Sequence, residues 1–299
     1  MRIRRTYLKI IFLALLAGIP VPLQSAESPS PRRLVSLAPS VTEILFRLGL
    51  GDRVVGVTMF CNFPPETAGK ARIGGFSNPS AEKIVSLKPD LVIVIPNVGN
   101  REAVNTVQRL GIDVLVLEIR DLDGLFRSIR EIGSATGVSR QADVLAGFLQ
   151  AEISSLGEQV VDLPHPSILI AFSRDPFIIA GPGSFPGELV RIAGGMIPVE
   201  DNDSHYPRLG MEMILKIAPE VILQTAMDGD TTGNADAQLL ESWKDWPALP
   251  AVAAGRVHTV DPDLILRPGP RVVEGIRELI RILHPGAVLE KSNAAPVDP

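Results

Sequence analysis

The sequence predicts an α/β protein of two Rossmann-like lobes, in which each lobe holds a parallel sheet and a single long helix joins the lobes. The first observation is a segment written twice: residues 81–94 (AEKIVSLKPDLVIV) reappear 130 residues later as 211–224 (MEMILKIAPEVILQ). The second is an alternation of short apolar runs with helical patterns, which is typical of parallel sheets. The third is residues 139–162, a stretch without proline that is rich in helix formers.

Both copies of the repeat indicate a short helix, then a proline, then a buried strand. Apolar residues recur with helical spacing in the first half of each copy. Pro89 and Pro219 end these helices, because proline cannot continue the helix and disfavours helical geometry in the residue before it. Residues 91–95 and 221–223 are apolar runs suited to strands buried inside a parallel sheet. Two similar lobes favour a ligand site between them.

The N-terminal lobe is expected to span residues 33–137. A strand at 34–38 precedes Ser40 and Glu43, whose spacing fits a capping box at the start of a helix. Further strands are expected at 53–57 and 113–117.

An interlobe helix is expected over residues 139–162, and a helix over most of that span would be roughly 30 Å long, at about 1.5 Å per residue. The C-terminal lobe follows at 167–284, and the polar tail at 285–299 is expected to be disordered. Within this lobe the patterns predict strands at 168–172, 177–180, 221–223 and 256–260, and helices at 188–193, 211–218 and 271–283.

Residues 1–26 have the pattern of a cleaved signal peptide. Basic residues precede a short apolar stretch that cannot span a bilayer, for which about 20 residues are needed, and small residues at 24–26 suit cleavage. No cysteine follows the apolar stretch, so no lipid attachment is expected. The mature chain is therefore expected in the periplasm.

Composition narrows the function classes. Removal of the leader would lower the formal net charge from −5 to −9, which disfavours nucleic acid and anionic membranes as partners. Cys61 is the sole cysteine, so we interpret it as a small buried residue rather than part of a disulfide framework.

Motifs for catalysis, cofactors or metals are weak. No hydrolase motif is present, and the glycine-rich residues 181–187 lack the lysine of a nucleotide loop, so a tight strand-to-helix turn explains them better. Glu200, Asp201, Asp203 and His205 do not complete a calcium loop. We therefore expect no catalytic residues, no metal site and no resident cofactor.

Glu82 and Glu212 occupy the same position in the two copies of the repeat. A glutamate in the first turn of a helix is favoured by the helix dipole, by about 0.3–1 kcal/mol, and this would explain each residue separately. A matched pair of exposed carboxylates on two lobes would also suit a partner that carries matched arginines.

Aromatic residues make up only 5% of the chain, yet several stand in loops. Phe60 follows a predicted strand, and Phe76 and Tyr206 each lie six residues before a repeat glutamate. Core packing is the usual role of a phenylalanine, but aromatic side chains in loops also line ligand sites. Trp243 and Trp246, in a proline-rich stretch, are interpreted as packing residues.

With these residues identified, the chain resembles the helical-backbone substrate-binding proteins of ABC importers for vitamin B12, ferric siderophores and haem, and most closely those for vitamin B12. The resemblance covers nearly all of the mature chain. It rests on LVSLAPSVTEIL (34–45), VVGVTMFCNFPP (54–65), SLKPDL (86–91), the stretch 246–263 and the closing PGPR (268–271).

The resemblance implies that cobalamin or a related corrinoid binds between the lobes of a monomer, which then delivers it to an inner-membrane permease and its ATPase. It assigns permease docking to Glu82 and Glu212. It assigns ligand contacts to Phe60, Phe76, Phe177, Tyr206, Asp263 and Arg267. A ferric siderophore or haem as the ligand, an exported enzyme, and a structural or sensory protein without a small ligand stay open as alternatives.

Overall fold

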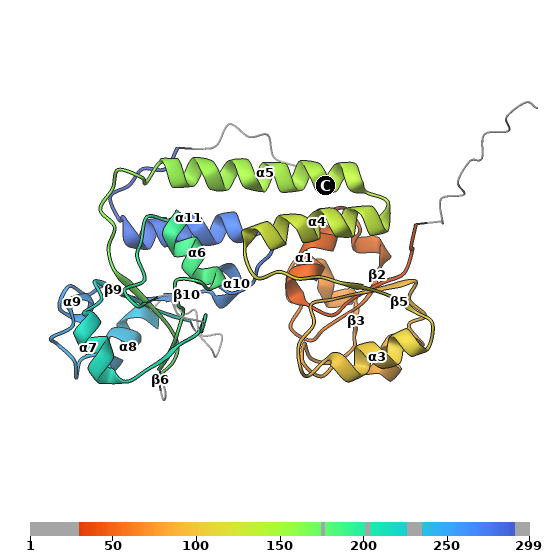
Figure 1. Cartoon of the computed structure of the whole chain (residues 1–299), viewed down its shortest axis with the longest axis horizontal. Coiled ribbons are helices and arrows are strands. Elements are labelled where there is room, and N and C mark those ends of the chain that lie inside the picture. The colour runs from red at the N-terminus through yellow and green to blue at the C-terminus, as the bar shows by residue number, and fades with distance from the viewer. Residues whose placement is uncertain (1–29, 175–176, 201–203, 226–234, 291–299) are drawn as a thin grey trace, which may run out of the picture. The chain divides into compact units, whose positions relative to one another are not determined.

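The computed structural model describes residues 30–174, 177–200, 204–225 and 235–290, which form two α/β lobes built on two five-stranded sheets (Figure 1). The predicted two-lobed fold is confirmed. The predicted signal peptide and the tail beyond residue 290 lie outside the described residues. Within the described part of the chain, no helix is both long and apolar enough to cross a membrane.

The sheet of the N-terminal lobe is entirely parallel, with strand order β3-β2-β1-β4-β5. Its strands are β1 (Leu34–Ser36), β2 (Val54–Val57), β3 (Ala71–Arg72), β4 (Leu91–Val94) and β5 (Asp113–Val116). Its helices are α1 (Pro39–Arg47), α2 (Ala81–Ser86), α3 (Arg101–Arg109) and α4 (Leu122–Thr136), with 3-10 turns η1 (Gly51–Arg53) and η2 (Pro65–Gly69). Strand β3 was hidden in the sequence because its two exposed residues carry no apolar pattern.

Helix α1 begins one residue before the predicted capping box, and that prediction is wrong. Ala38 is the N-cap residue and Pro39 takes the first helical position, where a missing N–H costs nothing. Ser40 and Glu43 therefore fall inside the helix, on its buried face. The Glu43 carboxylate consequently finds its partners outside the helix.

The C-terminal sheet has the order β10-β9-β6-β7-β8, and only part of it is parallel as predicted. Strands β6, β9 and β10 pair in parallel, whereas β7 pairs antiparallel with both of its neighbours, β6 and β8. Chain length explains the β6–β7 pair: residues 175 and 176 alone separate these strands, and a parallel connection needs about a dozen residues or more. The strands are β6 (Ile168–Arg174), β7 (Phe177–Ile179), β8 (Arg208–Leu209), β9 (Val221–Thr225) and β10 (Val257–Val260).

Helix α6 explains the glycine-rich segment of this lobe. The Ser184 hydroxyl accepts a hydrogen bond from the Gly187 N–H at 3.1 Å and caps the helix. A Cβ at Gly187 would lie 2.3 Å from the carbonyl oxygen of Gly181, so the turn requires glycine there. The helices of the lobe are α6 (Phe185–Ile192), α7 (Met211–Ile217), α8 (Ala235–Ser242), α9 (Pro250–Ala253), α10 (Pro262–Ile265) and α11 (Val272–Leu283).

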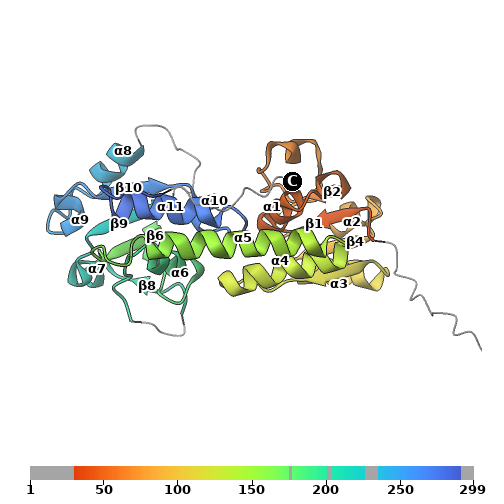
Figure 2. The same cartoon turned by 90° about the horizontal axis from the view of Figure 1, so that it is seen from above.

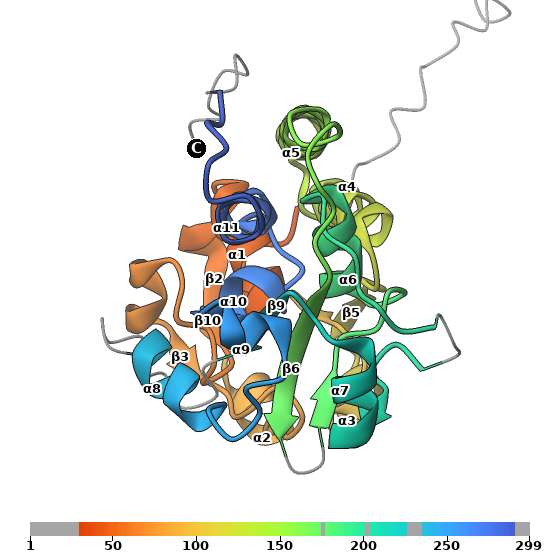
Figure 3. The same cartoon turned by 90° about the vertical axis from the view of Figure 1, so that its left-hand side faces the viewer.

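Helix α5 (Ser139–Glu158) packs against α4 of the first lobe and against α6 and α11 of the second (Figures 2 and 3). It ends four residues before the predicted limit at 162. One hydrophobic core follows α5 and includes Leu34 of β1 and Ile168 of β6, both fully buried. The two lobes therefore share apolar core along this helix.

The repeat is preserved in backbone conformation as well as in sequence. Lys88 and Ala218, which precede the two prolines, both adopt left-handed geometry, with φ of 47° and 46°. A residue before proline disfavours the right-handed helical region, and a left-handed residue is a common way to end a helix. The same two-residue device thus turns each repeat from helix into strand.

The acid at the tenth position of each repeat fastens a neighbouring strand. The Asp90 carboxylate accepts hydrogen bonds from the backbone N–H groups of Arg32 and Arg33, at 2.7 and 2.8 Å, just before β1. The Glu220 carboxylate accepts one from the Ser167 N–H at 2.8 Å, just before β6. The repeated acid is therefore structural in both lobes.

Close packing of α4 on α5 leads to a test of the helix pair. A Cβ at Gly133 would lie 2.3 Å from the Cβ of Ala142, so we expect Gly133→Ala to lower the free energy of unfolding by about 1–3 kcal/mol, as overpacked cores do. Urea unfolding followed by circular dichroism measures this. The control is Gly147→Ala on α5, where a Cβ meets nothing within 4 Å and where about 0.5–1 kcal/mol of stabilisation is expected. Equal effects of the two changes would contradict the packing argument.

Candidate functional site

The two repeat glutamates lie in equivalent, exposed places. Glu82 is in the first turn of α2 and Glu212 in the first turn of α7. Both side chains are exposed, and neither has a hydrogen-bond or ion-pair partner among the described residues. Each lobe therefore presents one free carboxylate at the start of a short helix.

A loop after β2 carries two exposed aromatic rings around a buried anchor. Cys61 is 1% exposed, and its Sγ lies 3.1 Å from the hydroxyl oxygens of Thr42 and Thr58. On either side of it, Phe60 and Phe63 are 56% and 41% exposed. The interpretation of Cys61 as a small buried residue is confirmed, and its role is to hold the loop in place.

A buried ion cluster joins the lobes next to this loop. Glu43 of α1 accepts a hydrogen bond from Arg267 Nη1 at 2.9 Å, and bonds from Arg271 Nε and Nη2 at 3.0 and 2.8 Å. The Glu43 side chain is 2% exposed and the two arginine side chains are 12% and 17% exposed. Because the arginines belong to the segment between α10 and α11, the cluster connects the first lobe to the second.

Asp263 and Arg267, both predicted ligand contacts, are brought together by this cluster. Arg267 Nη2 donates to Asp263 Oδ1 at 2.5 Å. Asn62 of the aromatic loop completes the arrangement: its Nδ2 donates to Asp263 Oδ2 at 2.8 Å and its Oδ1 accepts from Arg267 Nη1 at 2.9 Å. The exposed Phe60 thus lies beside the polar pair from the other lobe.

The charges of the cluster balance, since two carboxylates face two guanidinium groups. Burial on its own would lower the pKa of Arg271, but hydrogen bonds and charge from Glu43, with the charge of Asp263, raise that pKa above its ordinary value. Arg271 also lies over the Phe63 ring, 4.3 Å from its centre, in a cation–π contact. Arg271 is therefore charged at every pH at which the protein would work.

The other predicted ligand contacts differ in their surroundings. Phe76 is half-buried and packs against the main core. Tyr206 is 48% exposed, and its ring meets Phe172 edge-on at 5.6 Å. Partial burial raises the pKa of the Tyr206 phenol, so the hydroxyl stays protonated at neutral pH.

Phe177 does not join these side chains. It is 7% exposed, and its ring centre lies 5.6 Å from that of Trp243 inside the core of the C-terminal lobe. Strand β7 places this residue on the buried face of its sheet, and it therefore serves packing. Trp243 is fully buried and stacks edge-on with Trp246, which confirms the packing interpretation of both tryptophans.

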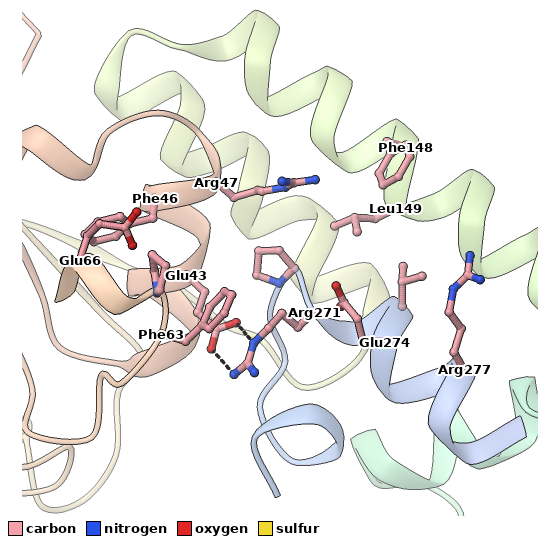
Figure 4. Close-up of a pocket in the computed structure, with 13 residues that line it drawn as sticks. Glu43, Phe46, Arg47, Phe63, Glu66, Phe148, Leu149, Arg271, Glu274 and Arg277 are labelled. Atoms are coloured by element: carbon pink, nitrogen blue, oxygen red, sulfur yellow. Dashed lines mark hydrogen bonds and ion pairs between the residues drawn. The ribbon is translucent and has the colours of Figure 1, made fainter. Parts of the chain in front are cut away.

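A cavity of about 480 Å³ adjoins the ion cluster (Figure 4). Its wall combines residues of α1, the aromatic loop, η2, α5, α11 and the two residues before α11, and it includes Glu43 and Arg271 of the cluster. None of the six predicted ligand contacts lines it. Its other lining residues are Phe46, Arg47, Phe63, Pro64, Glu66, Phe148, Leu149, Pro270, Val273, Glu274 and Arg277.

Three residues of the interlobe cluster were not among the predicted site residues: Glu43, Asn62 and Arg271. Each of them lies within a motif that carries the family resemblance, in LVSLAPSVTEIL, VVGVTMFCNFPP and PGPR respectively. Their location in these motifs was the signal by which the sequence could have identified them as site residues. Their distance along the chain, 228 residues between Glu43 and Arg271, concealed the contact.

Comparison with known proteins shows that the chain is similar to binding proteins of transport systems. A family model described as periplasmic binding protein matches residues 34–264. An uncharacterized ABC transporter substrate-binding lipoprotein of Bacillus subtilis is 32% identical over 267 residues, which cover 87% of this chain and 82% of that protein.

Two solved structures are similar in fold, and they are of proteins named for different ligands. The periplasmic vitamin B12-binding protein of Vibrio cholerae superimposes with a TM-score of 0.72 at 25% identity, covering 86% of this chain and 98% of the other. The periplasmic haem-binding protein of Roseiflexus superimposes with a TM-score of 0.76 at 27% identity, covering 86% and 99%. The comparisons therefore support the class of protein and leave the ligand open.

The interlobe cluster leads to a stability prediction. Glu43→Gln leaves two buried guanidinium groups without their carboxylate, so we expect a loss of about 3 kcal/mol or more in the free energy of unfolding. Chemical denaturation is the measurement. Glu278→Gln on α11 is the matched control, because its ion pair with Arg281 lies at the surface and is worth less than about 1 kcal/mol. A loss at position 43 no larger than at position 278 would show that the cluster does not hold the lobes.

Proposed function

Because the chain belongs to the periplasmic binding protein family, we propose that it is the periplasmic substrate-binding component of an ABC importer for cobalamin or a related corrinoid. The observation that carries the proposal is the exposed Phe60 beside the interlobe pair of Asp263 and Arg267. A corrinoid offers an apolar macrocycle to an aromatic ring and amide groups to a carboxylate and a guanidinium. Similarity to a vitamin B12-binding protein supports the same ligand.

Substrate-binding proteins of ABC transporters work with a permease and an ATPase. In the proposed function Glu82 and Glu212 are the contacts to the permease, one from each lobe. Their equivalent positions in α2 and α7, their exposure and their lack of partners among the described residues support this role. Arginines are the matching groups on the permease, since they bind carboxylates with two parallel hydrogen bonds.

Haem is the second candidate ligand, and a ferric siderophore is a further one. The similarity to a haem-binding protein supports haem, and so does Tyr206, an exposed phenol of the kind that can bind haem iron. The Asp263 and Arg267 pair beside Phe60 suits amide groups, which haem lacks. The corrinoid therefore stays the first proposal.

Ligand titration tests the corrinoid directly. We expect cyanocobalamin to give saturable heat in calorimetry, and haemin or a ferric siderophore to give much weaker binding, because the polar pair suits amide groups. Haemin titrated in the same buffer, and followed by its absorption spectrum, is the comparison. If haemin bound saturably and cyanocobalamin gave no heat, the corrinoid proposal would be wrong and haem would be the ligand supported.

The docking role of the glutamates is tested by separating uptake from affinity. We expect Glu82→Ala combined with Glu212→Ala to abolish uptake of labelled cyanocobalamin by cells, while the dissociation constant of the purified protein changes less than about twofold, since single surface substitutions shift energies by about 0.5 kcal/mol or less. Glu102→Ala is the control, because Glu102 is likewise the exposed second residue of its helix, α3. If ligand affinity collapsed in the double variant, the two residues would belong to the ligand site.

A further inference from the structure

We propose that the Asn62 side chain occupies, in the ligand-free protein, a receptor for a primary carboxamide formed by Asp263 and Arg267, and that the ligand enters by displacing it. This inference rests on the proposed function and specifies the group of the ligand that the site recognises. The three side chains form a closed ring in which each is hydrogen-bonded to the other two, at 2.8, 2.9 and 2.5 Å.

The ring has the chemistry of amide recognition. A primary carboxamide is a donor through its NH₂ and an acceptor through its oxygen, and Asn62 uses both, toward the carboxylate and the guanidinium respectively. A ligand carboxylate would place a negative charge beside Asp263 and could donate nothing to it. The receptor therefore selects carboxamides, which cobalamin carries around its macrocycle, over carboxylates such as those of haem.

The two receptor residues, Asp263 and Arg267, are largely buried, whereas Asn62, which occupies the receptor, is exposed. Arg267 is fixed from behind by Glu43, a side chain with 2% exposure, and both Arg267 and Asp263 are largely buried. Asn62, in contrast, is exposed and stands in a loop. Hydrogen bonds within the ring are its only contacts of this kind among the described residues.

Displacement of Asn62 requires no rearrangement of the loop. Cys61, the residue before it, is anchored by Thr42 and Thr58, and its carbonyl accepts a hydrogen bond from Arg72 at 2.8 Å. Rotation of the Asn62 side chain is enough to open the receptor. Phe60 and Phe63 on either side are already exposed, so an arriving macrocycle would meet the rings while its amide replaces that of Asn62.

Occupation of the receptor by Asn62 should weaken ligand binding by a measurable amount. A ligand that binds only the open fraction of a protein has an apparent dissociation constant raised in inverse proportion to that fraction. Removing the occupant should consequently strengthen binding, although it deletes two hydrogen bonds between the lobes. A purely structural role of Asn62 leads to the opposite expectation, because the lobes would then be less well held.

The experiment compares wild type, Asn62→Ala and the control Asn105→Ala, an exposed asparagine of α3, by calorimetric titration. The probes are cyanocobalamin and its separated monocarboxylic acids, in each of which one carboxamide has become a carboxylate. We expect Asn62→Ala to lower the dissociation constant of cyanocobalamin by about threefold or more, as an opened receptor should. For one of the monocarboxylic acids this gain should be lost, and Asn105→Ala should match the wild type.

The outcomes separate the inference from the proposed function. An unchanged or higher dissociation constant for cyanocobalamin in Asn62→Ala, with wild-type protein binding normally, overturns the displacement and leaves the corrinoid proposal intact. An equal gain for cyanocobalamin and every monocarboxylic acid overturns the selection of a carboxamide. If folded wild-type protein binds no cyanocobalamin, the proposed function fails and the inference fails with it.

Discussion

Glu43 lies on the buried face of α1 and accepts hydrogen bonds from Arg267 and Arg271 of the other lobe. Removing such charges from water costs several kcal/mol per ion, and the cost is recovered only where every group finds a well-placed partner. Here the two arginines, Glu43 and Asp263 satisfy one another in a cluster without net charge. The polar surface between the lobes exists in this form because that one carboxylate holds both guanidinium groups.

The hydrophobic core sets the frame within which the cluster can form. Helix α5 packs on α4 and on α6 and α11, and buried residues of both sheets join one apolar core along it. Apolar burial supplies most of the stabilisation but has little directionality. Hydrogen bonds between charged groups are directional, so the cluster adds contacts of defined geometry where the two lobes meet.

The same arrangement accounts for both halves of the proposed function. A fixed polar pair beside an exposed amide and exposed phenylalanines suits a ligand that is apolar in its body and polar at its edge. In each lobe, the repeat places in the first turn of a short helix a glutamate that has no partner among the residues the structure describes. Recognition of the ligand therefore depends on contacts between the lobes, whereas the proposed docking depends on a feature that each lobe forms alone.

Features that depend on neighbouring residues could be predicted from the sequence. Apolar periodicity and proline located most strands and the helices of the repeat, and the repeat revealed two lobes and the matched Glu82 and Glu212. Predictions from the sequence were wrong where a local pattern was overridden by another interaction of the same residues. Ser40 and Glu43 have capping-box spacing, yet Pro39 begins the helix and Glu43 serves the arginines. Three features became visible only in the folded protein: the antiparallel pairing of β7 with β6 and β8, the burial of Phe177, and the ring of Asn62, Asp263 and Arg267. The physical reason is separation: Asn62 and Arg267 are 205 residues apart, and their contact exists only once both lobes have packed on α5.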